Sequence, residues 1–196
     1  MIKSASRSSI TNDQKYRSML AGVVPSSEYL IETVVVGAGG VSDIVFSNLA
    51  QFSGVYRHLQ LIVVSRLSGS FPSASLALRF NGDTASNKTY HTLYGNGSNV
   101  ISSASTGHPF NYVTSASGAT LSSGAFAASS IDILDAFSTT KFKTIRGFGG
   151  LSGQVMLESS LWQSTNAASS LSIITSGLGI GSFVEGTRFS LYGVTA

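Results

Sequence analysis

Apolar and polar residues alternate with a period of two along most of this chain, in short runs. Leu59, Leu61 and Val63 share one face of such a run. Successive side chains of a β-strand point to opposite faces of the sheet, so this period predicts strands. Further runs with the same alternation cover residues 28–36, 43–46, 76–80, 131–133, 155–161, 171–173 and 189–191. A helical period is nearly absent, which favours an all-β fold.

Clusters of Gly, Asn, Asp and Ser separate these runs and predict turns. They cover residues 37–40, 81–83, 95–98, 147–150 and 177–181. Short strands joined by such turns indicate an antiparallel β-sandwich rather than a fold in which strands and helices alternate. We therefore predict an all-β, jelly-roll-like antiparallel sandwich.

Residues 1–27 show no sustained period, so we predict an extended N-terminal docking arm there and a single β-sandwich domain over residues 28–196. Four cations gather in this arm: Lys3, Arg7, Lys15 and Arg17. A basic, aperiodic segment is typical of an arm that becomes ordered on its partner, so these four residues are candidate docking contacts.

Residues 98–130 are rich in Ser, Ala, Gly and Thr, and their structure is open between two alternatives. They form either long loops or short strands whose small side chains pack closely against a neighbour. Small side chains specify the register of a strand only weakly.

Charged residues make up only 11% of the 196 residues, against about 25% in a typical soluble domain. With 42% hydrophobic residues and a net charge of +3, the chain differs from disordered proteins, which combine low hydrophobicity with high net charge. The absence of Cys excludes disulfides and thiolate metal sites. Because the excess cations lie in the arm, the body is close to neutral.

The low charge of the body predicts no nucleic-acid surface, since such surfaces cluster their cations. The first twenty residues contain no apolar segment of the kind a signal peptide needs. No run approaches the ~20 apolar residues of a membrane helix. We expect a protein that is made in a cytoplasm and keeps its N-terminus.

Residues 34–40 read Val-Val-Val-Gly-Ala-Gly-Gly and resemble the start of a dinucleotide-binding turn. Such a turn needs a third glycine, a helix and an acid about 20 residues further on. Here Ser42 stands at the third-glycine position, and no acid occurs between Asp43 and Asp83. We interpret the segment as a hairpin turn between two strands.

Acid–base hydrolysis of sugars needs two carboxyl groups about 5 to 9.5 Å apart. Asp132 and Asp135 form the one close pair in the second half of the body, and they carry a glycan-hydrolase hypothesis. Asp132 alternates with Ile131 and Ile133 and so points away from the core. Asp135 ends that strand, where an Asx-turn is the usual role of Asp. We favour the turn interpretation, and therefore no catalytic residues.

Metal and cofactor sites are not indicated. The three histidines, His58, His91 and His108, show no ligand spacing. Residues 81–83 with Asn87 lack the acids of a calcium loop. We expect no cofactor.

Aromatic and amide residues flank the turn at 95–98 and form a candidate contact with a glycan or a protein partner. They are Tyr90, His91, Tyr94 and Asn96. Aromatic rings stack on sugars or fill pockets of a partner. The alternative is that Tyr90 and Tyr94 share one strand face and pack as cross-strand pairs. We expect Trp162 in the core or in a subunit interface.

Several segments together resemble a family of small Ser/Gly-rich structural proteins of tailed bacteriophages, often labelled tail-fibre or virion structural proteins. The segments are Met19-Leu20-Ala21-Gly22, Arg57-His58-Leu59-Gln60-Leu61, Arg79-Phe80-Asn81-Gly82-Asp83, His91-Thr92-Leu93-Tyr94-Gly95-Asn96-Gly97, Ile131-Asp132-Ile133-Leu134-Asp135, Lys141-Phe142-Lys143-Thr144-Ile145-Arg146 and Phe189-Ser190-Leu191-Tyr192-Gly193. The resemblance implies a β-sandwich on the virion, and it implies no catalytic residues.

We therefore expect a non-enzymatic phage virion protein, a tail fibre or tail-appendage component that is attached through its arm. The expected partners are copies of itself, as a homotrimer, other virion proteins and, where the sandwich contacts the host, a surface glycan. Neither nucleic acid nor a membrane is an expected partner. The expected location is the virion, after assembly in the host cytoplasm. A capsid decoration (cement) protein and a carbohydrate-binding module are the alternatives.

Overall fold

The computed structural model describes residues 5–9, 27–175 and 178–195. Within these ranges the elements are β1 (Ala5–Ser9), β2 (Glu28–Val36), β3 (Asp43–Phe46), the 3-10 turn η1 (Leu49–Phe52), β4 (His58–Ser65), β5 (Ser73–Phe80), β6 (Lys88–Gly95), β7 (Val100–His108), β8 (Asn111–Ser117), β9 (Ala127–Leu134), β10 (Lys143–Leu151), β11 (Gln154–Trp162), β12 (Leu171–Ile174) and β13 (Arg188–Val194).

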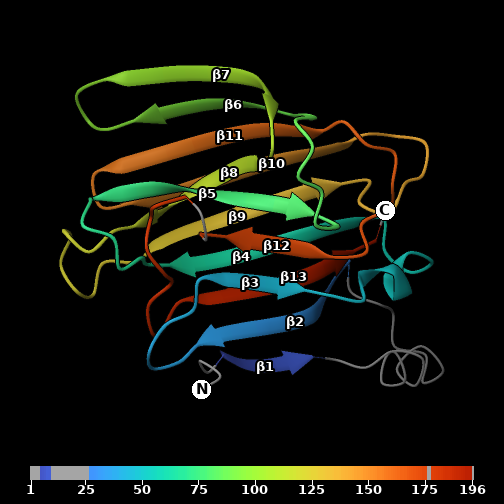
Figure 1. Cartoon of the computed structure of the whole chain (residues 1–196), viewed down its shortest axis with the longest axis horizontal. Coiled ribbons are helices and arrows are strands. Elements are labelled where there is room, and N and C mark those ends of the chain that lie inside the picture. The colour runs from blue at the N-terminus through green and yellow to red at the C-terminus, as the bar shows by residue number, and fades with distance from the viewer. Residues whose placement is uncertain (1–4, 10–26, 176–177, 196) are drawn as a thin grey trace.

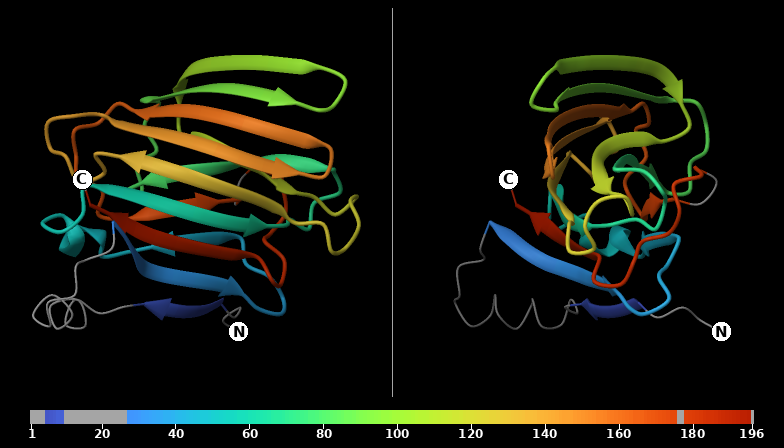
Figure 2. Two further views of the ribbon diagram at one scale, coloured as in Figure 1. Left: turned by 180° about the vertical axis from the view of Figure 1, so that it is seen from behind. Right: turned by 90° about the vertical axis from the view of Figure 1, so that its left-hand side faces the viewer.

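Two antiparallel sheets pack face to face, as Figures 1 and 2 show. The large sheet has nine strands in the order β1-β2-β13-β4-β9-β10-β11-β6-β7, and the small sheet has four in the order β3-β12-β5-β8. The predicted all-β antiparallel sandwich is thereby confirmed.

Eight of these strands are nested as in a jelly roll. In chain order they are β2, β3, β4, β5, β8, β9, β12 and β13. The first pairs with the last, the second with the seventh, the third with the sixth and the fourth with the fifth. Successive pairs lie alternately in the large and the small sheet, so one long hairpin is rolled into two layers.

Two inserted hairpins widen the large sheet beyond this jelly roll. The β10–β11 hairpin follows β9, and β6–β7 pairs with the outer edge of β11. Figure 1 shows β6 and β7 at the top, beyond the small sheet. The region 98–130, which the sequence left open, therefore forms β7, β8 and the beginning of β9.

At the opposite edge of the large sheet, β1 pairs antiparallel with β2. Part of the predicted arm is thus a strand of the sandwich. Arg7 lies in β1, whereas Lys3, Lys15 and Arg17 lie outside the described residues.

The core lies between the sheets and contains the predicted alternating residues. Leu59, Leu61 and Val63 are buried, as are the inward residues of the other runs in both sheets. Trp162 is 1% exposed and stacks on Phe80 of the small sheet, with ring centroids 4.8 Å apart and an interplanar angle of 4°. The expectation that Trp162 belongs to the core is confirmed.

Two fully buried lysines flank Trp162 in register on the neighbouring strands, Lys88 on β6 and Lys143 on β10. The Lys88 ammonium donates to the carbonyls of Asp83 and Ala85. The Lys143 ammonium donates to three carbonyls, including that of Ser164 at 3.3 Å. Burial lowers the pKa of both lysines, while the charge of a nearby aspartate acts in the opposite sense. These carbonyls replace the water that a buried ammonium loses.

The glycines at 37–40 form a crossover between the sheets, so the predicted hairpin turn is wrong. The flanking strands β2 and β3 lie in different sheets and do not pair. Gly39 and Gly40 have φ of 89° and 67°, a region that residues with a Cβ rarely adopt.

The glycines at 147–150 lie inside β10, so the turn predicted there is also wrong. A Cβ at Gly147 would lie 1.7 Å from the carbonyl oxygen of Val113 on β8. Gly147 therefore allows the backbone of the small sheet to approach the large sheet closely. The turn between β10 and β11 instead contains Gly153, whose φ is 79°.

We predict that Gly147→Ala lowers the free energy of unfolding by about 3 kcal/mol, because the added methyl group meets backbone that cannot move aside. Gly150→Ala is the matched control, since its Cβ would meet its nearest neighbour at an ordinary 3.6 Å. Urea unfolding of both variants measures the difference. Equal stability of the two variants would contradict this account of the sheet spacing.

Candidate functional site

The outer face of the large sheet carries a depression of about 890 Å³, lined by β6, β7, β9, β10 and β11. The left view of Figure 2 shows the molecule from behind, so that this face is toward the reader and no other described element lies over it. Leu93, Leu157 and Phe148 lie directly opposite one another on β6, β11 and β10, and they form an apolar row across it. The sheet therefore exposes apolar side chains at the centre of the depression.

A second depression of about 460 Å³ lies on the other side of Phe148, lined by β4, β9, β10 and β11. Val155 borders it, and Val100 lies in the same row as Val155, with Gly95 between them. We call Leu93, Val100, Phe148, Val155 and Leu157 the outer-face patch. Their exposed fractions lie between 44% and 77%.

Part of β11 departs from the usual orientation of a strand in a sandwich. A strand of a two-layer sandwich normally turns its apolar residues inward. Here Glu158 and Ser160 point toward the small sheet and are buried, whereas Val155 and Leu157 point outward. The sequence predicts that Val155, Leu157 and Leu161 share a face. The structure places Val155 and Leu157 on the exposed face, whereas the apolar residues Met156 and Trp162 lie on the buried one.

Polar groups border the patch. Asp132 accepts hydrogen bonds from Gln60 at 3.0 Å and from Arg146 at 3.1 Å, on three adjacent strands. His91 and Ser159 line the same depression. The carboxylate and the guanidinium compensate each other, so this ion pair adds no net charge to the face.

The structure divides the four residues that the sequence grouped as a candidate contact. Tyr90 and Tyr94 share the inner face of β6, as the alternative interpretation expects, whereas His91 is exposed on the outer face. Asn96 accepts hydrogen bonds from the backbone N–H groups of Ser98 and Asn99 and closes the β6–β7 turn. Of the four, only His91 lines the outer-face depression.

Tyr90 belongs to a cluster of aromatic rings where β6, β7 and β8 meet. Its ring meets those of His108 and Tyr112 edge to face, with centroids 5.1 and 4.9 Å away. Phe110 contacts both His108 and Tyr112. These contacts support the hairpin β6–β7 against the small sheet, which is a packing role.

Glu158 is a buried carboxyl group near Tyr112 of this cluster, only 4% exposed. The hydroxyl of Thr92 donates to its Oε2 at 2.7 Å, and Oε1 has no hydrogen-bond partner. Burial raises the pKa of Glu158 from 4.5 to about 7, although the hydrogen bond from Thr92 acts in the opposite sense. Sequence reasoning missed this residue because both faces of the strand carry apolar residues, Val155 and Leu157 on one and Met156 and Trp162 on the other.

We predict that Glu158 makes stability depend on pH. Because the folded-state pKa lies above the unfolded value, its stabilising effect is complete below about pH 4.5 and is lost as the pH rises through 7. From pH 4.5 to 8 the wild type should lose about 3 kcal/mol more than Glu158→Gln, as measured by urea unfolding. Glu185→Gln, at an exposed position, is the control. Parallel profiles for wild type and Glu158→Gln would contradict the prediction.

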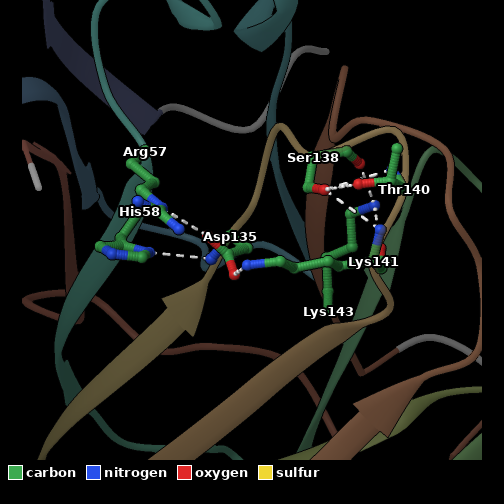
Figure 3. Close-up of polar contacts among 7 residues, drawn as sticks. All are labelled: Arg57, His58, Asp135, Ser138, Thr140, Lys141 and Lys143. Carbon is green, nitrogen blue, oxygen red and sulfur yellow. Dashed lines mark hydrogen bonds and ion pairs between the residues drawn. The ribbon is translucent and has the colours of Figure 1, made fainter.

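Asp135 lies at the end of β9 in a separate depression of about 500 Å³ and has a φ of 50°. Figure 3 shows Arg57 and Lys141 converging on its carboxylate, at 2.7 and 2.9 Å. Hydrogen bonds from these two cations lower the pKa of Asp135 to about 2. Its backbone N–H donates to Nδ1 of His58 at 2.8 Å. The carboxylate thus binds two cations rather than the backbone N–H groups of the favoured Asx-turn.

Asp132 and Asp135 do not face a common space. Asp132 lines the outer-face depression, and Asp135 lines the other one. A general acid needs a pKa near the working pH, and that of Asp135 is shifted in the opposite direction. This geometry does not provide the carboxylate pair that the glycan-hydrolase hypothesis requires.

Asp83, in the segment compared with a calcium loop, is used by protein donors. It accepts from Trp162 Nε1 at 2.7 Å, Asn87 Nδ2 at 3.0 Å and the N–H of Ala85 at 2.8 Å, and it pairs with Lys88. Burial would raise the pKa of Asp83, but these hydrogen bonds outweigh it and hold the pKa below its usual range. In the part of the chain that the structure describes, no three His, Cys, Asp or Glu side chains gather as metal ligands.

None of the helical segments in the described ranges has the length and apolar character needed to cross a bilayer. No family model matches the chain, and no curated protein is significantly similar to it.

Proposed function

We propose that the chain is a non-enzymatic structural protein of a bacteriophage virion, a tail fibre or tail-appendage component that associates with copies of itself. The observation that carries this proposal is the outer-face patch, a contiguous apolar surface on a sheet of low charge. Exposed apolar patches with polar borders are typical of protein–protein contacts, and charged residues are depleted from the centres of such contacts.

The sequence and the fold support the proposal from two further sides. The segments that resemble Ser/Gly-rich phage structural proteins lie largely in the sheets and their turns. Jelly rolls are common among viral capsid and lectin domains, which is an argument by analogy at the level of the fold. The absence of Cys suits a protein that assembles in a reducing cytoplasm.

The N-terminal arm supplies the proposed attachment to the particle. Its described part, β1, extends the large sheet at the edge opposite to β6–β7. Attachment and the outer-face patch therefore use different parts of the molecule. Lys3, Arg7, Lys15 and Arg17 are the proposed docking contacts.

Location on the particle tests the proposal. We expect gold-labelled antibodies against this chain to decorate the tails of the phage that encodes it, and mass spectrometry to find the chain in purified tails. Detection on heads alone would favour the capsid decoration protein instead. Absence from both heads and tails would overturn the proposal.

The arm is tested by deleting residues 1–24 and, separately, by replacing its four cations with Gln. We expect each change to reduce incorporation into particles at least about tenfold, because binding at oppositely charged surfaces depends on these cations. Thermal unfolding of the purified variants checks that the sandwich remains folded. Normal incorporation of the deletion variant would show that the arm does not attach the protein.

A further inference from the structure

We propose that the outer-face patch is the contact between two copies of this chain, related by a twofold axis. This inference deepens the self-association of the proposed function and rests on it for its biological setting.

The concentration of exposed apolar groups is the first argument. Eight large apolar side chains are exposed among the described residues, and five of them form the outer-face patch. Phe148 and its in-register neighbours Leu93 and Leu157 lie on adjacent strands, which are separated by about 4.8 Å. The patch is therefore continuous, and water is removed from it most effectively by another broad surface.

The charge of the face argues for a neutral protein partner. Arg146 and Asp132 compensate each other at the border, and Ser102, Ser130 and Ser159 supply hydroxyl groups around the depression. A polyanion such as nucleic acid would find no excess of cations here. A second copy of the same nearly neutral sheet fits, because burying this ion pair leaves no uncompensated charge on either side.

The location of the remaining apolar groups argues for twofold symmetry. The other three exposed large apolar side chains are separate: Val45 on the small sheet, Ile101 on the inner face of β7 and Phe142 before β10. A ring of three copies needs two different, complementary surfaces, whereas a twofold contact needs only one surface that meets itself. The described residues offer one patch, so the contact between patches is a dimer contact, in contrast to the homotrimer expected from the sequence.

Sedimentation equilibrium of the purified full chain between about 1 and 100 µM is the main test. We expect the wild type to form dimers in this range and the dimer dissociation constant of the Phe148→Ser/Leu157→Ser variant to be at least about tenfold higher. Phe142→Ser/Val45→Ser is the matched control, because it removes one exposed aromatic and one exposed aliphatic side chain away from the patch. The control should dimerise like the wild type. Thermal unfolding verifies that all variants are folded.

A second measurement uses the absence of Cys from the natural chain. A single cysteine introduced by Ser159→Cys, at the border of the patch, should give a covalent dimer with a flexible bifunctional thiol cross-linker, which does not require the two sulfur atoms to be in contact. Val45→Cys, on the small sheet, should not do so at the same concentration. This test remains valid where a patch variant fails to fold.

A wild type that stays monomeric at 100 µM would overturn the inference, as would a trimer that the Phe148→Ser/Leu157→Ser change leaves intact. Binding of the monomer to a saccharide array, lost in that variant, would assign the patch to a glycan instead. The outcome is independent of particle location: a dimer absent from particles refutes only the virion proposal, and a monomer found on tails refutes only the dimer contact.

Discussion

The close packing of the small sheet on one face of the large sheet determines the orientation of nearly every side chain in this protein. Strand side chains alternate, so burying one residue of a strand also settles which of its neighbours face outward. On β11 the stacking of Trp162 against Phe80 places Trp162 inward, and the same alternation turns Glu158 inward and Leu157 outward. The buried carboxyl group and the exposed apolar patch are therefore two results of one packing constraint.

The strands and much of the core could be predicted from the sequence, because strong alternation and large apolar residues coincide there. The run at 28–36 corresponds to β2, and Leu59, Leu61 and Val63 are buried as expected. The role of Gly147 could not be predicted, because a glycine that permits close packing and one that permits a turn look alike in a sequence. The burial of Lys88 and Lys143 could not be predicted either. Most of their carbonyl partners lie in the loops just before them. Their burial beside Trp162, however, requires the pairing of β6 and β10 with β11.

The candidate site shows the same division. The location of Tyr90 and Tyr94 on the same face of β6 follows from their even spacing. The alternation of Asp132 with Ile131 and Ile133 likewise predicts that Asp132 points away from the core. The partners of Asp132 could not be read from the sequence. Gln60 comes from a strand far away in the chain, and Arg146 meets Asp132 only because of the register in which β10 pairs with β9. The sequence indicates which residues of one strand share a face. The strand order of the sheet decides which faces become neighbours.

The nesting of the jelly roll has a consequence for how the chain folds. β2 borders β13, the last strand among the described residues, and so this pairing must wait until residues 188–194 have been synthesised. Contacts between residues so far apart in sequence make folding slow, and an unpaired strand edge invites aggregation meanwhile. β1 is the large-sheet partner of β2 that is synthesised before it, and its pairing covers one of the two exposed edges during this delay. β1 can thus protect the growing chain until β13 is available.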